Sequence, residues 1–211
     1  MKADLRVGQN FEGAAYSFRP TGFELFTIMA GDRVFKVPGR LGDIPALQLE
    51  TPADGLLVVV HETRDNRLTY TEWAKFVKFA EHKAFPTTLA DHEARGISKE
   101  KFVEKDRRYA KSMIAVGDGA GKDRQTGMKT EIVEIANPYT DTISEMPIQV
   151  FLDQRPRADA QIEVFEKSPD DVVEIRLYRT DSEGIANIPV KPGFEYLFDA
   201  VAMVPLENSD P

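Results

Sequence analysis

The sequence predicts a mainly β protein of two β-sandwich domains, with a short helical insertion in the first. The clearest signal is in the last third of the chain, where the alternating runs 172–179 and 185–190 flank the polar segment 180–184 (TDSEG). Turn-forming residues between runs that alternate apolar and polar side chains are typical of a β-hairpin. Further short runs of this kind occupy 148–152, 161–165 and 194–203. Short strands at this spacing are typical of an antiparallel sandwich.

Strand patterns also fill the first half of the chain. Four short runs are bounded by Gly, Pro or Asp, namely 3–7, 23–29, 33–37 and 47–50. Between the second and third of them, Gly31-Asp32 predicts a two-residue hairpin turn. The run 55–61 (GLLVVVH) is apolar at successive positions, so we expect a central strand that is covered on both faces.

A helical insertion interrupts the strands at about 71–104. Thr71 is a suitable N-cap for a helix over 72–83. The apolar residues of this helix fall on one face, which we expect to pack on the first sandwich: Trp73, Phe76, Val77 and Ala80. A second, shorter helix is predicted over 88–95 and should end at Gly96 in the left-handed conformation.

The segment 117–127 predicts a domain boundary, because it is rich in glycine and charge and has no apolar period. The first domain is then expected at 1–118, including the helical insertion, and the second at 127–211.

Composition excludes several classes of protein. The chain has 211 residues, a formal net charge of −8 and no cysteine. This acidic excess argues against a nucleic-acid partner, which would require clustered Lys and Arg. The missing cysteines exclude disulfides, thiolate metal sites and cysteine nucleophiles. The longest apolar run, 56–60, is too short for membrane insertion, and no apolar signal-peptide segment follows the first six residues.

The three histidines are the candidates for a metal ligand or a general base. His82 lies opposite Trp73 on the helical wheel and should face solvent. His61 continues a buried strand face, and a buried imidazole must be hydrogen-bonded or ligated, so it is either structural or a metal ligand. His92 lies between Asp91 and Glu93, a pattern typical of a solvated helix face. It is the second histidine that could contribute to a metal site with His61.

No arrangement of residues predicts catalysis, and we expect a non-enzymatic protein. Gly121-Lys122 resembles part of a phosphate loop, but Val116 and Asp123 occupy the positions that need Gly and Ser or Thr. The acidic turn 181–183 lacks the twelve-residue pattern of a calcium loop. No serine occupies a strand-turn-helix elbow.

An ordered set of short motifs resembles a known family over nearly the whole chain. The motifs are Arg107-Arg108-Tyr109-Ala110-Lys111, Val116-Gly117, Glu131-Ile132-Val133, Asn137-Pro138-Tyr139, Thr180-Asp181 with Gly184, and Pro192-Gly193. They resemble a bacterial family of domains of unknown function once named as the NikM-like periplasmic component of nickel uptake. The Thr-Asp-x-x-Gly segment is also similar to transthyretin-like and carboxypeptidase-regulatory-like modules, which are built on immunoglobulin-like sandwiches. The resemblance therefore implies a transthyretin-like second domain.

The resemblance also implies a location, a metal and a partner. Its members are periplasmic or secreted, so it implies an extracytoplasmic protein linked to nickel or cobalt uptake, with a membrane transporter component or an envelope protein as partner. Compared with the family pattern, the chain opens at the second strand and stops before a last tryptophan-containing strand, as if truncated at both ends.

Together these observations predict a non-enzymatic extracytoplasmic binding or accessory module. The alternative is a cell-envelope interaction module that binds carbohydrate or protein without a metal. Saturable nickel or cobalt binding distinguishes the first from the second.

Overall fold

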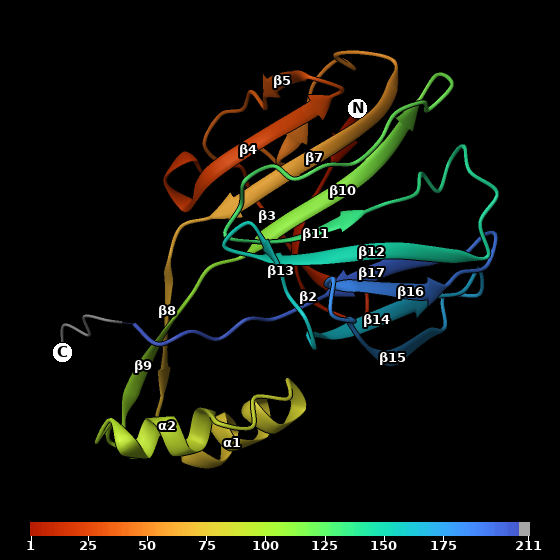
Figure 1. Ribbon diagram of the computed structural model, residues 1–211. Coiled ribbons are helices and arrows are strands. Elements are labelled where there is room, and N and C mark those ends of the chain that lie inside the picture. The colour runs from red at the N-terminus through yellow and green to blue at the C-terminus, as the bar shows by residue number, and fades with distance from the viewer. Residues whose placement is uncertain (207–211) are drawn as a thin grey trace. The chain divides into compact units, whose positions relative to one another are not determined.

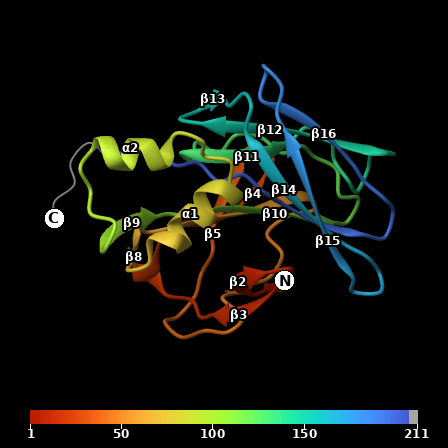
Figure 2. The same ribbon diagram turned by 90° about the horizontal axis from the view of Figure 1, so that it is seen from below.

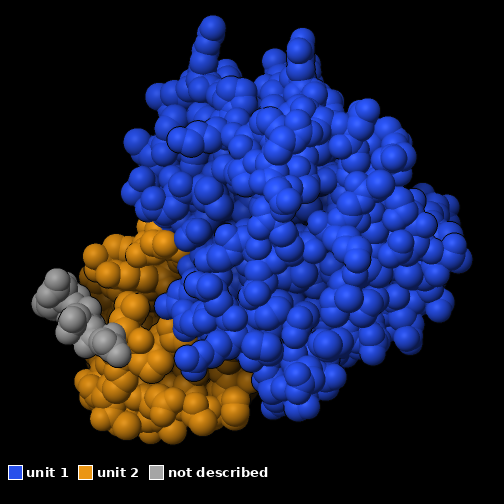
Figure 3. Space-filling view, turned by 45° about the horizontal axis from the view of Figure 1, so that its top comes forward, with its two compact units in different colours: residues 1–64, 108–200 blue, residues 65–107, 201–211 orange. Residues whose placement is uncertain are grey.

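The computed structural model describes residues 1–206 and is mainly β, as the sequence predicts (Figure 1). The chain divides into two compact units (Figure 3). Unit 1 contains Met1–Arg64 and Arg108–Ala200, and unit 2 contains Asp65–Arg107 together with the chain from Val201. The helical insertion thus lies in a unit of its own.

Unit 1 contains a four-stranded antiparallel sheet in the order β10-β7-β4-β5. Its strands are β4 (Phe23–Ala30), β5 (Arg33–Lys36), β7 (Gly55–Thr63) and β10 (Tyr109–Val116). Ala30 pairs with Arg33, so the turn between β4 and β5 is the predicted Gly31-Asp32. Gly31 has a φ of 56°, a conformation that glycine adopts without a Cβ penalty.

The central strand β7 is apolar on both faces, as predicted. Leu57 and Val59 belong to one apolar cluster, which includes Phe26, whereas Val58 and Val60 belong to another. Smaller pairs of strands lie nearby: β1 (Lys2–Ala3) with β6 (Leu47–Gln48), and β2 (Leu5–Gln9) with β3 (Glu12–Tyr16); the short 3-10 helix η1 (Pro20–Gly22) precedes β4.

The rest of unit 1 forms a β-sandwich. One sheet consists of β11 (Thr130–Glu134), β12 (Glu145–Leu152), β13 (Arg155–Pro156) and β16 (Ile185–Pro189). The other has the order β15-β14-β17, with β14 (Gln161–Lys167), β15 (Val173–Arg179) and β17 (Glu195–Asp199). The paired strands β14 and β15 lie side by side in Figure 2. Side chains of both sheets meet in one apolar cluster, which includes Ile148, Val150, Ile162, Val164 and Ile188.

The predicted hairpin around 180–184 is wrong, although both of its strands exist. β15 pairs with β14 and β16 pairs with β12, so the turn carries the chain from one sheet of the sandwich to the other. Asp181 Oδ1 accepts hydrogen bonds from the backbone N–H groups of Glu183 and Ile185, each at 2.9 Å. Such a turn stabilises a local reversal but does not determine which strands pair.

Unit 2 contains the predicted helices between two paired strands. These elements are β8 (Asn66–Tyr70), α1 (Trp73–His82), α2 (Thr88–Ala94) and β9 (Phe102–Asp106). The N-cap of α1 is Glu72 rather than Thr71, and no side chain caps the helix. Within the described chain, no helix is long and apolar enough to span a membrane.

The apolar face of α1 is the predicted one. Phe76 and Ala80 are buried, Trp73 is half-buried and His82 is exposed. Its aromatic residues contact the β8-β9 pair of their own unit: the ring of Phe76 lies 5.0 Å from that of Phe102. We expected this face to pack on the first sandwich, but the insertion carries two strands that cover it.

The segment 117–127 contains no helix or strand. Unit 1 includes both this segment and the chain on either side of it. The backbone N–H of Leu56 donates to the carbonyl of Ala120 at 2.8 Å, and the side chain of Asn137 donates to Gly119 and Gly121. The compact units therefore do not divide at this segment. Separate folding of 1–118 and 127–211 stays a prediction.

Candidate functional site

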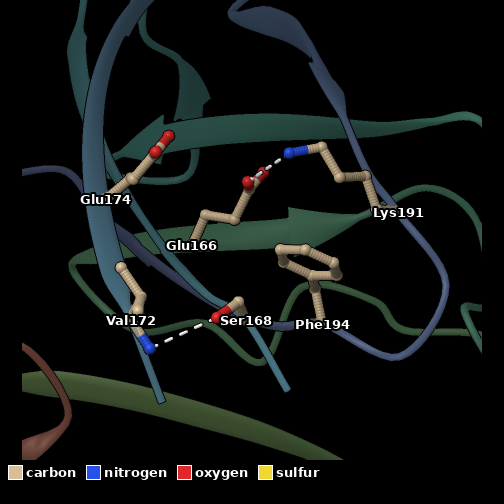
Figure 4. A pocket seen from close by; sticks show the side chains of 6 residues that line it. All are labelled: Glu166, Ser168, Val172, Glu174, Lys191 and Phe194. Atoms are coloured by element: carbon tan, nitrogen blue, oxygen red, sulfur yellow. Dashed lines mark hydrogen bonds and ion pairs between the residues drawn. The ribbon is translucent and has the colours of Figure 1, made fainter. Parts of the chain in front are cut away.

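The β-sandwich of unit 1 contains a pocket of about 240 Å³ (Figure 4). We call it the Glu166 pocket and define it by its lining residues: Glu166, Ser168, Val172, Glu174, Lys191 and Phe194. Glu166 comes from β14 and Glu174 from β15. The other four come from the turn between these strands and from the turn before β17, so one sheet and its turns build the whole pocket.

Local hydrogen bonds hold both turns in place. Ser168 donates its backbone N–H to the carbonyl of Val172 at 2.9 Å, and the N–H of Val172 donates to Ser168 Oγ at 3.2 Å. In the other turn Gly193 has a φ of 79°, which follows from its position after Pro192 in a tight reversal. The Ser168 hydroxyl accepts from Val172 and retains its own proton for donation.

Glu166 is the buried centre of the pocket, with a side chain only 5% exposed. Lys191 Nζ donates to Oε1 at 2.6 Å, and the Tyr196 hydroxyl donates to Oε2 at 3.1 Å. The hydrogen bond from Lys191 is the main reason why the pKa of Glu166 lies below its usual value. A carboxylate with charge-assisted hydrogen bonds stays ionised and fixes the position of its donors.

The rim of the pocket is more exposed and carries both charges and an aromatic ring. Glu174, with 61% of its side chain exposed, forms an ion pair with Arg176 at 2.9 Å. Lys191 Nζ lies 4.8 Å from the centre of the Phe194 ring. The pocket therefore offers carboxylate acceptors, ammonium and hydroxyl donors and one apolar ring surface, a combination suited to binding a small polar molecule.

A second polar group of residues in unit 1 is closed to solvent. We call it the Lys111 cluster: Lys111, Asp123, Glu131 and Glu134. Lys111 Nζ donates to Asp123 Oδ2 at 2.6 Å and to Glu131 Oε1 at 3.1 Å. These three side chains are at most 5% exposed. Glu131 also accepts the backbone N–H of Thr126, at 2.8 and 3.0 Å to its two oxygens.

The fourth residue of the Lys111 cluster is Glu134, a carboxyl with a raised pKa. Burial raises its pKa to about 8, and its hydrogen bond with Asp123 and the charge of Asp123 act in the same direction, whereas Lys111 acts against them. Glu134 is therefore protonated at neutral pH. Lys111, Asp123 and Glu131 form a hydrogen-bonded network that ties β10 and β11 to the segment 117–127.

Several residues of the motifs that carry the family resemblance make structural contacts, either in the Lys111 cluster or elsewhere in unit 1. Lys111 and Glu131 belong to the Lys111 cluster. Tyr139 donates its hydroxyl to the carbonyl of Met113 at 2.8 Å, and Thr180 donates to the carbonyl of Arg157 at 2.7 Å. Asn137 is 4% exposed and donates to two carbonyls of the segment 117–127. These contacts connect elements that are distant in sequence.

A family model described as "Domain of unknown function (DUF4198)" matches residues 1–204. The chain belongs to this family. No curated protein and no solved structure matches it.

In this DUF4198 chain, His61 lies half-buried on β7, among aromatic rings. Its ring centre is 5.0 Å from that of Phe26 and 5.6 Å from that of Phe23. Burial lowers the pKa of His61, so the imidazole is neutral at neutral pH. This environment agrees with the predicted apolar face of the strand.

His92 does not lie on a solvated face, and that prediction is wrong. Its side chain is 6% exposed and packs against the rings of Trp73 at 4.7 Å and Phe102 at 4.6 Å between ring centres. His92 Nε2 lies 3.2 Å from the carbonyl oxygen of Ser98. Successive helical residues point about 100° apart, so acidic neighbours in sequence say little about the face of a single residue.

Within residues 1–206, no group of three or more His, Cys, Asp or Glu side chains has an arrangement that could hold a metal ion. His61 and His92 belong to different units. Their assignment to a metal site stays a prediction.

Sequence reasoning missed both the Glu166 pocket and the Lys111 cluster. A signal for the pocket does exist, because Ile162, Val164 and Glu166 share one face of β14 and only the last is charged. A charged residue in an apolar series indicates a buried partner. The partner, Lys191, is 25 residues away, and nothing in the sequence connects the two.

Proposed function

We propose that the protein is a non-enzymatic binding module of the cell envelope that holds a small hydroxyl-rich ligand, such as one sugar ring, in the Glu166 pocket. The observation that carries this proposal is the convergence of an ionised buried carboxylate, a fixed ammonium and an aromatic ring in one pocket. It favours the metal-free alternative among the functions that the sequence suggests.

The chemistry of the pocket suits hydroxyl groups. Carboxylate oxygens of Glu166 and Glu174 accept hydrogen bonds from hydroxyls, while Lys191 and Ser168 donate to them. Phe194 offers apolar surface to the C–H face of a ring. Since Lys191 is already held by Glu166, a ligand meets a donor that needs no reorganisation. A volume of about 240 Å³ is below the usual range for drug-sized ligands and suits a single ring.

The charge of the pocket predicts an order of ligands. Two carboxylates and one ammonium give the lining residues a formal net charge of −1, but the guanidinium of Arg176, 2.9 Å from Glu174 and 3.8 Å from Glu166, brings the site close to neutral. Neutral hexoses should therefore bind at least as tightly as amino sugars or uronic acids. Isothermal titration with one member of each class tests this order.

Two variants and a control test the site itself. Glu174→Gln and Phe194→Ala should each weaken sugar binding by about tenfold or more. Glu195→Gln removes a charge from the same sheet outside the pocket and should leave affinity unchanged. Equal affinity in all three variants, or no saturable binding by any of the three sugar classes, contradicts the proposal.

The family resemblance supports a second candidate, an accessory role in nickel or cobalt uptake with a transporter component or an envelope protein as partner. The neutral imidazole of His61 is the form that binds metal. If His61 is a ligand, His61→Ala should abolish nickel or cobalt binding and His82→Ala should not. A loss of stability in His61→Ala with no difference in calorimetric metal titrations contradicts this candidate. Periplasmic or secreted localisation belongs to both proposals and is supported by the resemblance alone.

A further inference from the structure

The strand β15 is an edge strand with an unusual surface. In the part of the chain that the structure describes, β15 pairs with β14 and with no other strand. Along one face, Ile175 is 50% and Leu177 is 57% exposed. Proteins normally protect a long apolar edge, because its free N–H and C=O groups can pair with another strand.

The apolar face extends across the whole sheet. Ile175 lies opposite Phe165 in the register of β14, and Phe165 lies opposite Leu197 of β17. Leu197 is itself 44% exposed. Three neighbouring strands thus present one apolar band that ends at the free edge of β15, where a further strand would extend it.

The sequence of β15 is complementary to itself. If two copies pair antiparallel about Ile175, Glu174 lies opposite Arg176 of the partner subunit, and Val173 lies opposite Leu177 of the partner subunit. Directly opposed residues point to the same face, so apolar residues meet apolar residues and each acid meets a base.

Two other edge strands of unit 1 lack this property. Within residues 1–206, β17 pairs only with β14, and β5 only with β4. Self-pairing of β17 about Leu197 would place Glu195 opposite Asp199 of the partner subunit, and self-pairing of β5 would place Arg33 opposite Lys36 of the partner subunit. Like charges directly opposed disfavour both pairings. The charge pattern therefore favours self-pairing of β15 over self-pairing of β5 or β17.

We propose that two copies of this chain join along β15, antiparallel about a two-fold axis at Ile175, into one continuous six-stranded sheet. The interface is isologous, because the same strand is used by both copies. Glu174 and Arg176 already form an ion pair within one chain. In the dimer, the ion pairs of the two copies would lie side by side, so that four charges of alternating sign line the interface. Since Glu174 lines the Glu166 pocket, Arg176 of the partner subunit would arrive at its rim. The dimer does not depend on what the pocket binds.

Charge reversal with the full chain tests this proposal. Glu174→Arg and Arg176→Glu each oppose like charges, so each variant alone should be monomeric in sedimentation velocity at concentrations where the wild type is dimeric. An equimolar mixture of the two variants should form a heterodimer, and the double variant should recover the homodimer. Circular dichroism and thermal melts verify that all variants fold, which is expected because both side chains are largely exposed.

Two further measurements separate β15 from other contacts. Ile175→Lys places two ammonium groups face to face and should abolish the dimer, whereas Glu195→Lys on β17 should leave it intact. Raising the salt concentration should weaken the wild-type dimer, because its charge pairs are near the surface. A wild-type chain that stays monomeric at several hundred micromolar, or variants whose mixture fails to associate, would overturn the proposal. A purified monomer that binds a strand of a different protein counts against it in the same way.

Discussion

The Lys111 cluster and the Glu166 pocket use the same chemistry in opposite surroundings. Each is built around a lysine that donates to a carboxylate at 2.6 Å, and each joins elements distant in sequence. In the Lys111 cluster, lysine and carboxylate are both excluded from solvent, with side chains 5% and 0% exposed. In the Glu166 pocket, the carboxylate is buried but its lysine is 49% exposed.

This difference in exposure distinguishes the closed Lys111 cluster from the Glu166 pocket, to which we assign a binding role only as a proposal. In the Lys111 cluster, Asp123 and Glu131 both accept hydrogen bonds from Lys111 and the pKa of Glu134 is raised, so the cluster can hold the segment 117–127 but presents little to a ligand. In the Glu166 pocket the lysine, the rim acid and the aromatic ring still meet water. A lysine–carboxylate ion pair can therefore bind a ligand only where one of its two side chains is exposed to solvent.

The largest expected effect is the loss of the lysine from the closed site. Lys111→Met leaves Asp123 and Glu131 buried without their counter-charge, and removal of one partner from a buried network costs roughly 3–5 kcal/mol. Urea denaturation at neutral pH should measure this loss. Lys191→Met is the matched control, because Glu166 keeps its bond from Tyr196 and can gain water, and we expect about 1 kcal/mol or less. Equal losses in the two variants would mean that exposure does not distinguish the sites.

The next effect is a loss of stability with rising pH, which the Lys111 cluster should show and the Glu166 pocket should not. The folded chain holds the proton of Glu134 up to about pH 8, whereas a carboxyl in the unfolded chain releases it near 4.5. Between these values the folded state binds more protons, so stability falls as pH rises. Glu134→Gln, which has no proton to release, should remove this pH dependence.

The measurement compares wild type with Glu134→Gln in urea at pH 5 and at pH 8. The stability of the wild type relative to Glu134→Gln should be highest at pH 5 and should fall as the pH rises to 8. A difference that stays constant across this range would show that Glu134 is ionised in the folded state.

Some features of the fold could be predicted from the sequence because they depend on residues that are close together in the chain. Features that depend on contacts between distant residues could not. The central strand β7 is evident because Leu56 to Val60 are contiguous and apolar, and the α1 face is evident because Phe76 and Ala80 repeat at helical spacing. Both patterns are local. The pairing of β15 with β14 rather than β16 is not local, because the turn 180–184 is compatible with either partner.

The Glu166 pocket and the Lys111 cluster were hidden for the same reason, because each depends on a lysine from a distant element. Lys111 and Glu131 appear in the motifs that carry the resemblance, but their distance of 3.1 Å depends on how β10 and β11 are placed. His92 shows the converse error, since its polar neighbours in sequence suggested solvent while Trp73 and Phe102 bury it. Charge pairs and aromatic contacts between separate elements are consequences of the fold, and a single sequence contains no pattern for them.

The smallest expected effect is a pH dependence of opposite sign at the Glu166 pocket. The hydrogen bond from Lys191 lowers the pKa of Glu166, so this carboxylate stabilises the folded chain above the pKa of the unfolded state, and the contribution is lost as pH falls through the lower, folded pKa. Glu166→Gln should therefore be less stable than wild type at pH 7, by about 1 kcal/mol for an ion pair with an exposed partner. The stabilities of the two proteins should converge as the solution is acidified below the usual carboxyl range.

Thermal melts at pH 7 and pH 3 measure this convergence. Glu195→Gln is the control, because Glu195 is 67% exposed and lies 3.6 Å from its lysine. A gap between wild type and Glu166→Gln that widened in acid would mean that Glu166 is protonated in the folded chain, and the pocket would then lack the carboxylate that the proposed ligand requires.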